Sequence, residues 1–169
     1  MIKLSSSLLL LALVFFGLTT NAQFHERMCK IENAESGRVL DADTHTINKN
    51  GTIVQLWNWD NRENQKWKLR EVSPGVYTIE NAQSRRMLDA DSHTLNMKGT
   101  IVHLFDQMNN EHQKWRIERT GDGTFKIVCV ESGRVIDADT HTIKENGTKV
   151  QLWDWDGRNN QKWRIIPLN

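Results

Sequence analysis

Most of the chain consists of three copies of one 48-residue unit. Two short segments recur at this spacing: Gln-Lys-Trp, which ends at Trp67, Trp115 and Trp163, and Asp-Ala-Asp, which begins at Asp41, Asp89 and Asp137. Three units are too few for a β-propeller, which needs about four blades or more. A solenoid of three units needs terminal capping repeats, and the sequence shows none. The spacing therefore predicts a closed structure with threefold pseudosymmetry, which also avoids exposed sheet edges.

Within each unit, apolar and polar residues alternate over short runs that are separated by turn residues. In the first unit this alternation predicts four strands, near residues 28–33, 38–42, 53–57 and 66–70. Three such units give an all-β domain of about twelve short strands. The Asn-Gly pairs at Asn50 and Asn146 favour tight hairpins. Turns at Pro74-Gly75 and at residues 121–123 are expected to join the units.

The first 22 residues have the features of a secretory signal peptide. Lys3 precedes the apolar run Leu8–Phe16, and the small residues Thr20 and Ala22 precede the expected cleavage point. A membrane anchor is the alternative, but this run is shorter than the roughly 20 residues of a spanning helix. We therefore expect a secreted, extracellular protein with a mature domain at residues 23–169. Its repeats would cover about residues 26–73, 74–121 and 122–169.

The charge balance and the cysteine count exclude several classes of protein. Lys and Arg number 22 and Asp and Glu number 21, without a basic run, so nucleic acid is not an expected partner. No apolar stretch after the signal peptide is long enough to span a membrane. Two cysteines, Cys29 and Cys129, supply neither a disulfide scaffold nor a Cys-rich zinc site. An internal bridge and two separate thiols are both compatible with a secreted protein.

Strand parity divides the tryptophans into two groups. Successive side chains of a strand point to opposite faces. Gln55 and Trp57 therefore share the face opposite Leu56, and Asp41 points outward if Leu40 points inward. In the third repeat the outward positions are Asp137, Gln151 and Trp153. The tryptophans of the Gln-Lys-Trp segments are expected in the core.

Two explanations fit the outward tryptophans. In the first, Trp57 and Trp153 only pack against neighbouring loops. In the second, each ring is a platform for a sugar, whose apolar C–H face stacks on the indole. The nearby carboxylate would accept hydrogen bonds from two hydroxyl groups, and side-chain amides can both donate to and accept from hydroxyls. The combination favours the sugar platform.

With these residues the sequence resembles the ricin-type (R-type) lectin family, whose members have a β-trefoil fold and a Gln-x-Trp mark in each of three subdomains. The resemblance covers about residues 28–168. It implies binding of a sugar, most often galactose or N-acetylgalactosamine. In the first repeat it implies a carboxylate, a polar strand residue, a stacking aromatic, an amide donor and a supporting glutamine at Asp41, Gln55, Trp57, Asn64 and Gln65. In the third repeat these roles fall on Asp137, Gln151, Trp153, Asn160 and Gln161.

The second repeat departs from this pattern. It keeps Asp89 and Gln113, but His103, Phe105 and His112 replace the polar strand residue, the tryptophan and the amide donor. Phe105 retains a flat surface for stacking. The two histidines make this a weaker predicted site and give it groups that titrate near neutral pH.

Other features of the repeats have a purely structural explanation as well as a functional one. Asp43 and His45, which recur in each repeat, offer metal ligands, but a polar turn after the strand is the favoured interpretation, and no metal or cofactor is expected. Asn50 and Asn146 begin N-glycosylation sequons, which also fit simple turns. Paired carboxylates would suit a glycosidase. They recur three times, whereas an active site usually occurs once, so no enzyme activity is expected.

The sequence therefore predicts a secreted lectin whose partners are glycans or glycoconjugates, bound at two or three shallow sites. Several weak sites together would give useful avidity. One alternative is a β-trefoil module that binds a protein, such as a protease inhibitor, although the even repeat spacing leaves little room for a protruding loop. Another is a targeting subunit of a separate toxin or enzyme.

Overall fold

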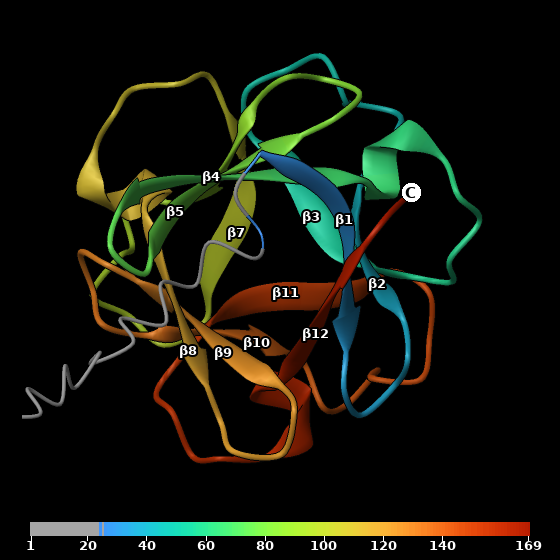
Figure 1. Ribbon diagram of the computed structural model, residues 1–169, viewed down its shortest axis with the longest axis vertical. Helices are drawn as coiled ribbons and strands as arrows, with labels where there is room; N and C mark the ends of the chain where they lie inside the picture. The colour runs from blue at the N-terminus through green and yellow to red at the C-terminus, as the bar shows by residue number, and fades with distance from the viewer. Residues whose placement is uncertain (1–23, 25) are drawn as a thin grey trace, which may run out of the picture.

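The computed structural model describes residue 24 and residues 26–169, and the predicted signal peptide at residues 1–22 lies outside the described residues (Figure 1). The first repeat contains β1 (Arg27–Asn33), β2 (Val39–Ala42), β3 (Thr52–Trp57), the 3-10 turn η2 (Glu63–Gln65) and β4 (Trp67–Ser73). The second contains β5 (Val76–Asn81), β6 (Met87–Ala90), β7 (Thr100–Phe105), η3 (Glu111–Gln113) and β8 (Trp115–Arg119). The third contains β9 (Phe125–Cys129), β10 (Val135–Ala138), β11 (Thr148–Trp153), η4 (Asn159–Gln161) and β12 (Trp163–Pro167). The expected all-β class is confirmed.

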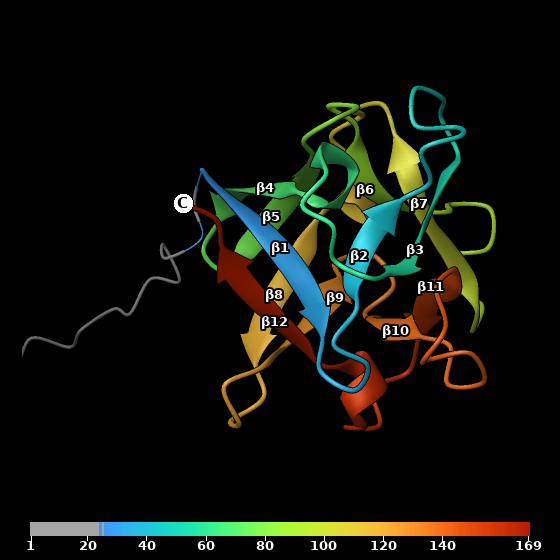
Figure 2. The same cartoon turned by 90° about the vertical axis from the view of Figure 1, so that its right-hand side faces the viewer.

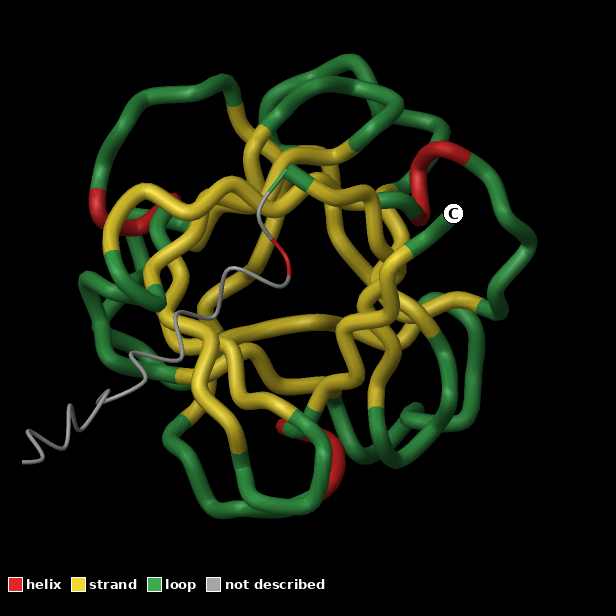
Figure 3. Tube along the Cα trace, viewed as in Figure 1, coloured by secondary structure: helices red, strands yellow, loops and turns green. Residues whose placement is uncertain are grey.

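Six of these strands form a closed ring of antiparallel pairs. The ring runs β1–β4–β5–β8–β9–β12 and returns to β1. The loops lie around the outside of the strands (Figure 3). Because every strand of the ring has a partner on both sides, the ring itself has no free sheet edge.

The remaining six strands form three hairpins, β2–β3, β6–β7 and β10–β11. Strands β3, β7 and β11 also pair with one another. The hairpins therefore gather at one end of the molecule, which lies on the right of Figure 2. Each repeat contributes one hairpin, and each hairpin touches both neighbouring repeats.

The core contains one tryptophan from each repeat. Trp67, Trp115 and Trp163 are fully buried. Their indole Nε1 atoms donate to backbone oxygens of β2, β6 and β10 at 3.0, 3.0 and 3.1 Å. Each buried N–H thus has the partner that burial requires, and the bond ties the last strand of a repeat to its second. The prediction that these residues form the core is confirmed.

The turns match the sequence in part. Pro74 and Gly75 connect β4 to β5, and residues 120–124 connect β8 to β9, as expected. The Asn-Gly pairs do not form two-residue hairpins. Gly51 ends the loop 43–51, and its backbone N–H donates across the repeat boundary to the Leu104 oxygen at 2.8 Å. Its positive φ of 84° explains why glycine stands there.

The two cysteines are separate, buried free thiols. Cys29 Sγ donates to the Trp67 oxygen at 3.3 Å, and burial raises the pKa of the Cys29 thiol. Of the two arrangements that the sequence left open, the structure has unbridged thiols. Among the described residues, no helix is long and apolar enough to cross a bilayer.

Candidate functional site

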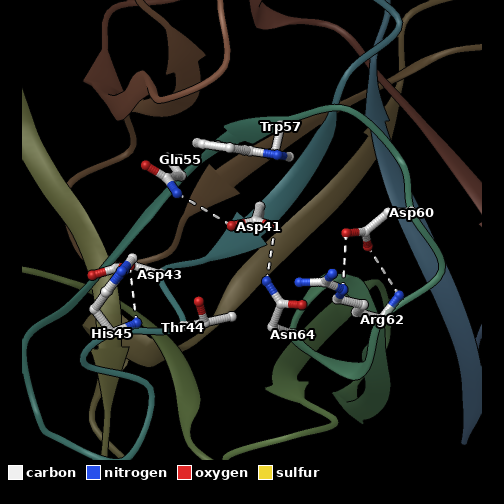
Figure 4. Close-up of a pocket in the computed structure, with 9 residues that line it drawn as sticks. All are labelled: Asp41, Asp43, Thr44, His45, Gln55, Trp57, Asp60, Arg62 and Asn64. Atoms are coloured by element: carbon white, nitrogen blue, oxygen red, sulfur yellow. Dashed lines mark hydrogen bonds and ion pairs between the residues drawn. The ribbon is translucent and has the colours of Figure 1, made fainter.

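Strands β2 and β3 and the η2 turn of the first repeat line a cavity of about 410 Å³. Asp41 and Gln55 are direct partners across the β2–β3 pair, and Trp57 lies two residues further along β3. Asn64 enters from η2. Figure 4 shows the Trp57 ring above the Asp41 carboxylate, with Asn64 on the opposite side of that carboxylate. The fold thus brings together four of the predicted site residues.

Trp57 is 38% exposed and Trp153, its counterpart in the third repeat, is 36% exposed. Along β3 and β11 the buried and accessible residues alternate, so that Leu56 and Leu152 point inward and the tryptophans point outward. The predicted parity of these strands is confirmed. Both indoles border their cavities and have part of their surface open to a ligand.

Asp41 is the centre of the hydrogen-bond network in the first cavity. Its Oδ1 accepts from Gln55 Nε2 at 3.2 Å, and its Oδ2 accepts from Asn64 Nδ2 at 2.8 Å and from Gln65 Nε2 at 2.9 Å. Asp41 is only 5% exposed. Strand parity predicts that Asp41 points outward, on the face opposite Leu40. Its side chain is nevertheless buried in the structure, because all four residues of β2 are buried and the surrounding amides cover the carboxylate. Asp137 is buried in the same way.

The amides of Asn64 and Gln65 are used within the protein. Asn64 Nδ2 also donates to the Ala42 oxygen at 2.9 Å. Gln65 Nε2 also donates to the Asn58 oxygen at 2.9 Å, and Gln65 Oε1 accepts from the Asp60 N–H at 2.9 Å. Gln65 therefore holds both Asp41 and the preceding loop, residues 58–62. Its supporting role in a sugar site stays a prediction. A direct contact between Asn64 and a ligand stays a prediction.

Burial and hydrogen bonding act in opposite directions on the central carboxylates. Burial raises the pKa of Asp41, and the hydrogen bonds from Gln65, Gln55 and Asn64 offset only part of that rise. In the third repeat, burial likewise raises the pKa of Asp137. A carboxylate that has lost much of its hydration and is held by amides is an electrostatically strong acceptor for hydroxyl groups.

Five residues that line the first cavity are missing from the predicted site: Asp43, Thr44, His45, Asp60 and Arg62. Arg62 Nε lies 3.2 Å from Asp60 Oδ2 and forms an ion pair at the rim. A signal for this pair was present in the sequence. Both residues recur 96 positions later in the third repeat, whereas the second repeat has Met108 and Asn110.

Asp43 belongs to a turn. Strand β2 ends at Ala42, and Asp43 Oδ1 accepts from the His45 N–H at 3.1 Å and lies 2.9 Å from His45 Nδ1. Burial opposes ionisation of Asp43, but the hydrogen bonds from His45 and Thr46 together lower its pKa. The polar-turn interpretation of the Asp-Ala-Asp-x-His segment therefore agrees with the structure.

The third repeat reproduces the first cavity residue for residue. All nine lining positions carry the same amino acid as in the first repeat: Asp137, Asp139, Thr140, His141, Gln151, Trp153, Asp156, Arg158 and Asn160. Asp137 accepts from Gln151, Asn160 and Gln161 at 3.2, 2.8 and 3.0 Å. The cavity is smaller, at about 170 Å³.

Comparison with known proteins assigns this architecture to a family. A profile described as ricin-type β-trefoil lectin domain-like matches residues 19–105, 63–153 and 111–169. The chain belongs to this lectin-like family. Its all-β fold is accordingly a β-trefoil. No curated protein matches the chain.

Three solved structures show the range of similar proteins. The designed threefold-symmetric protein ThreeFoil is 26% identical with a TM-score of 0.79, over 83% of this chain and 99% of that one. The exo-β-1,3-galactanase 1,3Gal43A from Clostridium thermocellum is 27% identical with a TM-score of 0.78, over 84% of this chain but only 30% of the enzyme. The Macrolepiota procera ricin B-like lectin, in complex with lactose, is 23% identical with a TM-score of 0.65, over 84% and 96% of the two chains.

In this lectin-like domain, the cavity of the second repeat differs in chemistry. Asp89 Oδ2 accepts from Gln113 at 2.8 Å, as in the other repeats, but its Oδ1 lies 2.9 Å from His103 Nε2. His112 Nε2 lies 3.5 Å from the same carboxylate. Phe105 replaces the indole and has its ring centre 5.8 Å from that of His103. The fold assembles the predicted second-repeat residues, and their binding of a ligand stays a prediction.

The sequon asparagines lie where neighbouring repeats of the lectin-like domain meet. Asn50 of the first repeat donates from Nδ2 to Asp106 Oδ2 of the second at 3.0 Å. Asn146 of the third repeat accepts from the Asn58 N–H of the first at 2.9 Å. Both asparagines are exposed. Glycosylation at either position stays a prediction, and a glycan on Asn146 would stand beside the first cavity.

Proposed function

We propose that this protein is a secreted lectin that binds terminal sugars, galactose or N-acetylgalactosamine among them, at the cavities of its first and third repeats. The observation that carries the proposal is the pairing of a part-exposed indole with a buried, amide-held carboxylate, at Trp57 with Asp41 and at Trp153 with Asp137. Membership of the lectin-like family supports the same conclusion.

The unused hydrogen-bond acceptors of the first cavity suit a pyranose. Asp41 Oδ2 already accepts two hydrogen bonds and Oδ1 accepts one. A carboxylate has about four acceptor positions, so one hydroxyl group can donate to Oδ1. The Gln55 amide donates to Asp41 through Nε2, and its oxygen can accept from a second hydroxyl. The indole of Trp57 then covers the C–H face of the ring.

The proposed preference for galactose-type sugars is supported by two of the similar proteins. The Macrolepiota procera lectin was solved with lactose, whose terminal ring is galactose. The enzyme from Clostridium thermocellum is a galactanase. These ligands belong to those proteins, and they indicate which sugars to test first on this chain.

A glycan array with the protein from residue 23 onward, followed by titration calorimetry, tests the proposal. We expect binding to galactose-terminated glycans that is weak for a free monosaccharide and stronger for a clustered glycan, because several sites then engage together. The matched control is the double variant Asp41→Asn and Asp137→Asn, which keeps the shape of both side chains and removes the charge. Equal binding by this variant would contradict the assignment of the carboxylates.

A targeting role is a second candidate. The chain covers only 30% of the similar galactanase, so a domain of this type can form one part of a larger enzyme. In that case the lectin would deliver a separate catalytic or toxic chain to a glycan. Co-purification of the secreted protein from its native source with a stoichiometric second chain would support this role, and isolation of the single chain would count against it.

A further inference from the structure

The first and third cavities are lined by the same nine amino acids, so a difference in charge between them must come from the residues around them. Each cavity is bordered by a loop from a neighbouring repeat. The Gly147 N–H donates to the Leu56 oxygen at 2.9 Å and brings Asn146 to the first cavity. The Gly99 N–H donates to the Leu152 oxygen at 2.9 Å and brings Lys98 to the third. Asn146 and Lys98 are therefore equivalent positions with different charge.

At the third cavity, the Lys98 ammonium group lies over the Trp153 ring. Its Nζ lies 5.6 Å from the centre of the Trp153 ring and 2.9 Å from Asp154 Oδ2. At the first cavity, Asn146 is uncharged, and its Oδ1 accepts from the Asn58 N–H at 2.9 Å and from Arg38 Nε at 3.1 Å. The third platform therefore has an ammonium group at the place where the first has a neutral amide.

A second lysine adds to this difference. Lys149, on the outer face of β11, donates from Nζ to the Gly99 oxygen at 3.1 Å. A Cβ atom at Gly99 would lie 3.8 Å from this Nζ and 3.9 Å from Trp153 Cζ3, so the ammonium and the indole edge both flank Gly99. Its counterpart beside the first cavity is Ile53, which is 51% exposed. Hydrogen bonds from His141 lower the pKa of Asp139, and the positive charge of Lys149 adds to that effect.

The anions near these lysines do not cancel the difference. Asp154 pairs with both Lys98 and Arg134, at 2.9 and 3.1 Å. Its counterpart in the first repeat, Asn58, is neutral. The charged lining residues, including the three aspartates, the arginine and the histidine of each cavity, are the same in both. At these three rim positions the third cavity thus has two additional cations, Lys98 and Lys149, and one additional anion, Asp154, a surplus of one positive charge over the first.

We infer that the third site prefers glycans whose terminal sugar carries a carboxylate or sulfate group, and that the first site prefers neutral sugars. This inference rests on the proposed function. The acidic substituent would lie beside Trp153, between the Lys98 and Lys149 ammonium groups, while the ring occupies the same position as a neutral sugar at Trp57. One protein would then recognise two classes of glycan with one set of lining residues.

The test isolates each site. Trp153→Ala leaves the first site and Trp57→Ala leaves the third, with the second-repeat cavity common to both. Each variant is presented with an array of neutral glycans and their sulfated or sialylated counterparts. Lys98 Nζ lies 5.6 Å from the centre of the Trp153 ring. One unit charge at this separation in water changes binding of an oppositely charged group by about threefold at low salt. We expect the acidic-to-neutral ratio to be at least about threefold higher for Trp57→Ala, and the difference to shrink as salt is raised.

Exchange of the rim residues provides the matched controls. In the Trp57→Ala background, Lys98→Asn should lower the acidic-to-neutral ratio and Lys98→Arg should preserve it. In the Trp153→Ala background, Asn146→Lys should raise the ratio. Because Lys98→Asn and Asn146→Lys each insert the amino acid that the equivalent loop already carries, the fold should tolerate them, and these two exchanges test the inference independently.

The possible outcomes distinguish failure of this inference from failure of the proposed lectin function. Equal ratios in both backgrounds, with neutral glycans still bound, would overturn the inference and leave the lectin assignment standing. Ratios that differ but do not respond to either exchange would also overturn it, because the lysines would not be the cause. Loss of all glycan binding in the parent protein would overturn the proposed function and the inference together.

Discussion

Gln65 Nε2 lies 2.9 Å from Asp41 Oδ2 and joins the repeated Gln-Lys-Trp segment to the carboxylate at the centre of the first cavity. The same bond measures 2.8 Å in the second repeat and 3.0 Å in the third. It persists in the second repeat although His103 and His112 replace the glutamine and the asparagine of the other two cavities. The bond is therefore part of the framework that all three repeats share, and it positions the acceptor whichever ligand is bound.

Replacement of Gln65 by Ala should weaken both the fold and the site. The variant removes the buried hydrogen bond from Gln65 to the Asp41 carboxylate, and a hydrogen bond to a charged group contributes about 1.5–3 kcal/mol. We expect a loss of unfolding free energy in this range, measured by urea denaturation. Gln83→Ala, at an exposed position, is the control and should be close to neutral. Equal stability of the two variants would contradict the framework role.

The tryptophan platforms can be tested one at a time. Trp57→Ala and Trp153→Ala should each remove one site, with a loss of about 1–2 kcal/mol of binding free energy per site from the missing stacking contact. The double variant should lose agglutination, because agglutination requires more than one site. Trp155→Ala is the matched control, since Trp155 is 39% exposed but lines neither cavity. If Trp155→Ala reduces binding as much as Trp57→Ala, the platform assignment is wrong.

Sugar binding should decline on acidification at a higher pH than an ordinary aspartate would give. Binding needs the ionised Asp41 and Asp137, and burial raises the pKa of both carboxyl groups. The midpoint should therefore lie above the ordinary aspartate value of about 3.9. Calorimetry over a pH series measures the midpoint, and circular dichroism at each pH confirms that the fold persists. A midpoint at or below about 3.9 would contradict the raised pKa.

The same aspartates and those of the turns have opposite effects on stability. Because the folded-state pKa of Asp41 is raised, its contribution to stability is present below the unfolded pKa and is lost as pH rises through the folded pKa. The pKa of Asp43 is lowered, so its contribution is present above the unfolded pKa and is lost as pH falls through the folded pKa. In the Asp43→Asn variant, we therefore expect a smaller loss of stability on acidification than in the parent, measured by urea denaturation at neutral and acid pH.

Cys129 occupies a position where the other two repeats have asparagine. Asn33 donates from Nδ2 to the Asn160 oxygen at 3.0 Å and accepts from the Ser36 N–H at 3.1 Å. Asn81 makes the equivalent bonds at 2.9 and 3.1 Å. Cys129→Asn should form the same bonds in the third repeat, and each is worth about 1 kcal/mol. We expect a rise in Tm of a few degrees.

The reverse exchange is the control for this position. Asn33→Cys should lower the Tm, because it removes bonds that the structure contains. A fall in Tm for Cys129→Asn would mean that the third repeat has no space for the larger side chain, and it would contradict the equivalence of the three positions.

Both thiols should resist modification in the native protein. Cys29 and Cys129 are buried and unbridged, so iodoacetamide should label neither thiol under native conditions and both after denaturation without a reducing agent. The measurement is intact mass before and after alkylation. A mass increase for denatured protein that requires prior reduction would reveal a disulfide and contradict the structure.

The sequence by itself determined the strands, the core and part of the lining of the cavities. Alternation placed Trp57 outward and Leu56 inward because the side-chain period of a strand is fixed by backbone geometry. The repeat then placed Trp153 in the equivalent position. The same internal comparison could have identified Asp60 and Arg62. Local periodicity and repetition were sufficient for each of these predictions.

Only the tertiary structure decided how exposed Asp41 is and which residues surround each cavity. The burial of Asp41 depends on amides 14 to 24 residues away. Lys98 meets Trp153, and Asn146 meets Asn58, because the three hairpins pair with one another across repeat boundaries. A periodic pattern specifies the face on which a side chain lies. It does not specify which distant loop the pairing of hairpins brings beside that face, and the third cavity acquires Lys98 in this way.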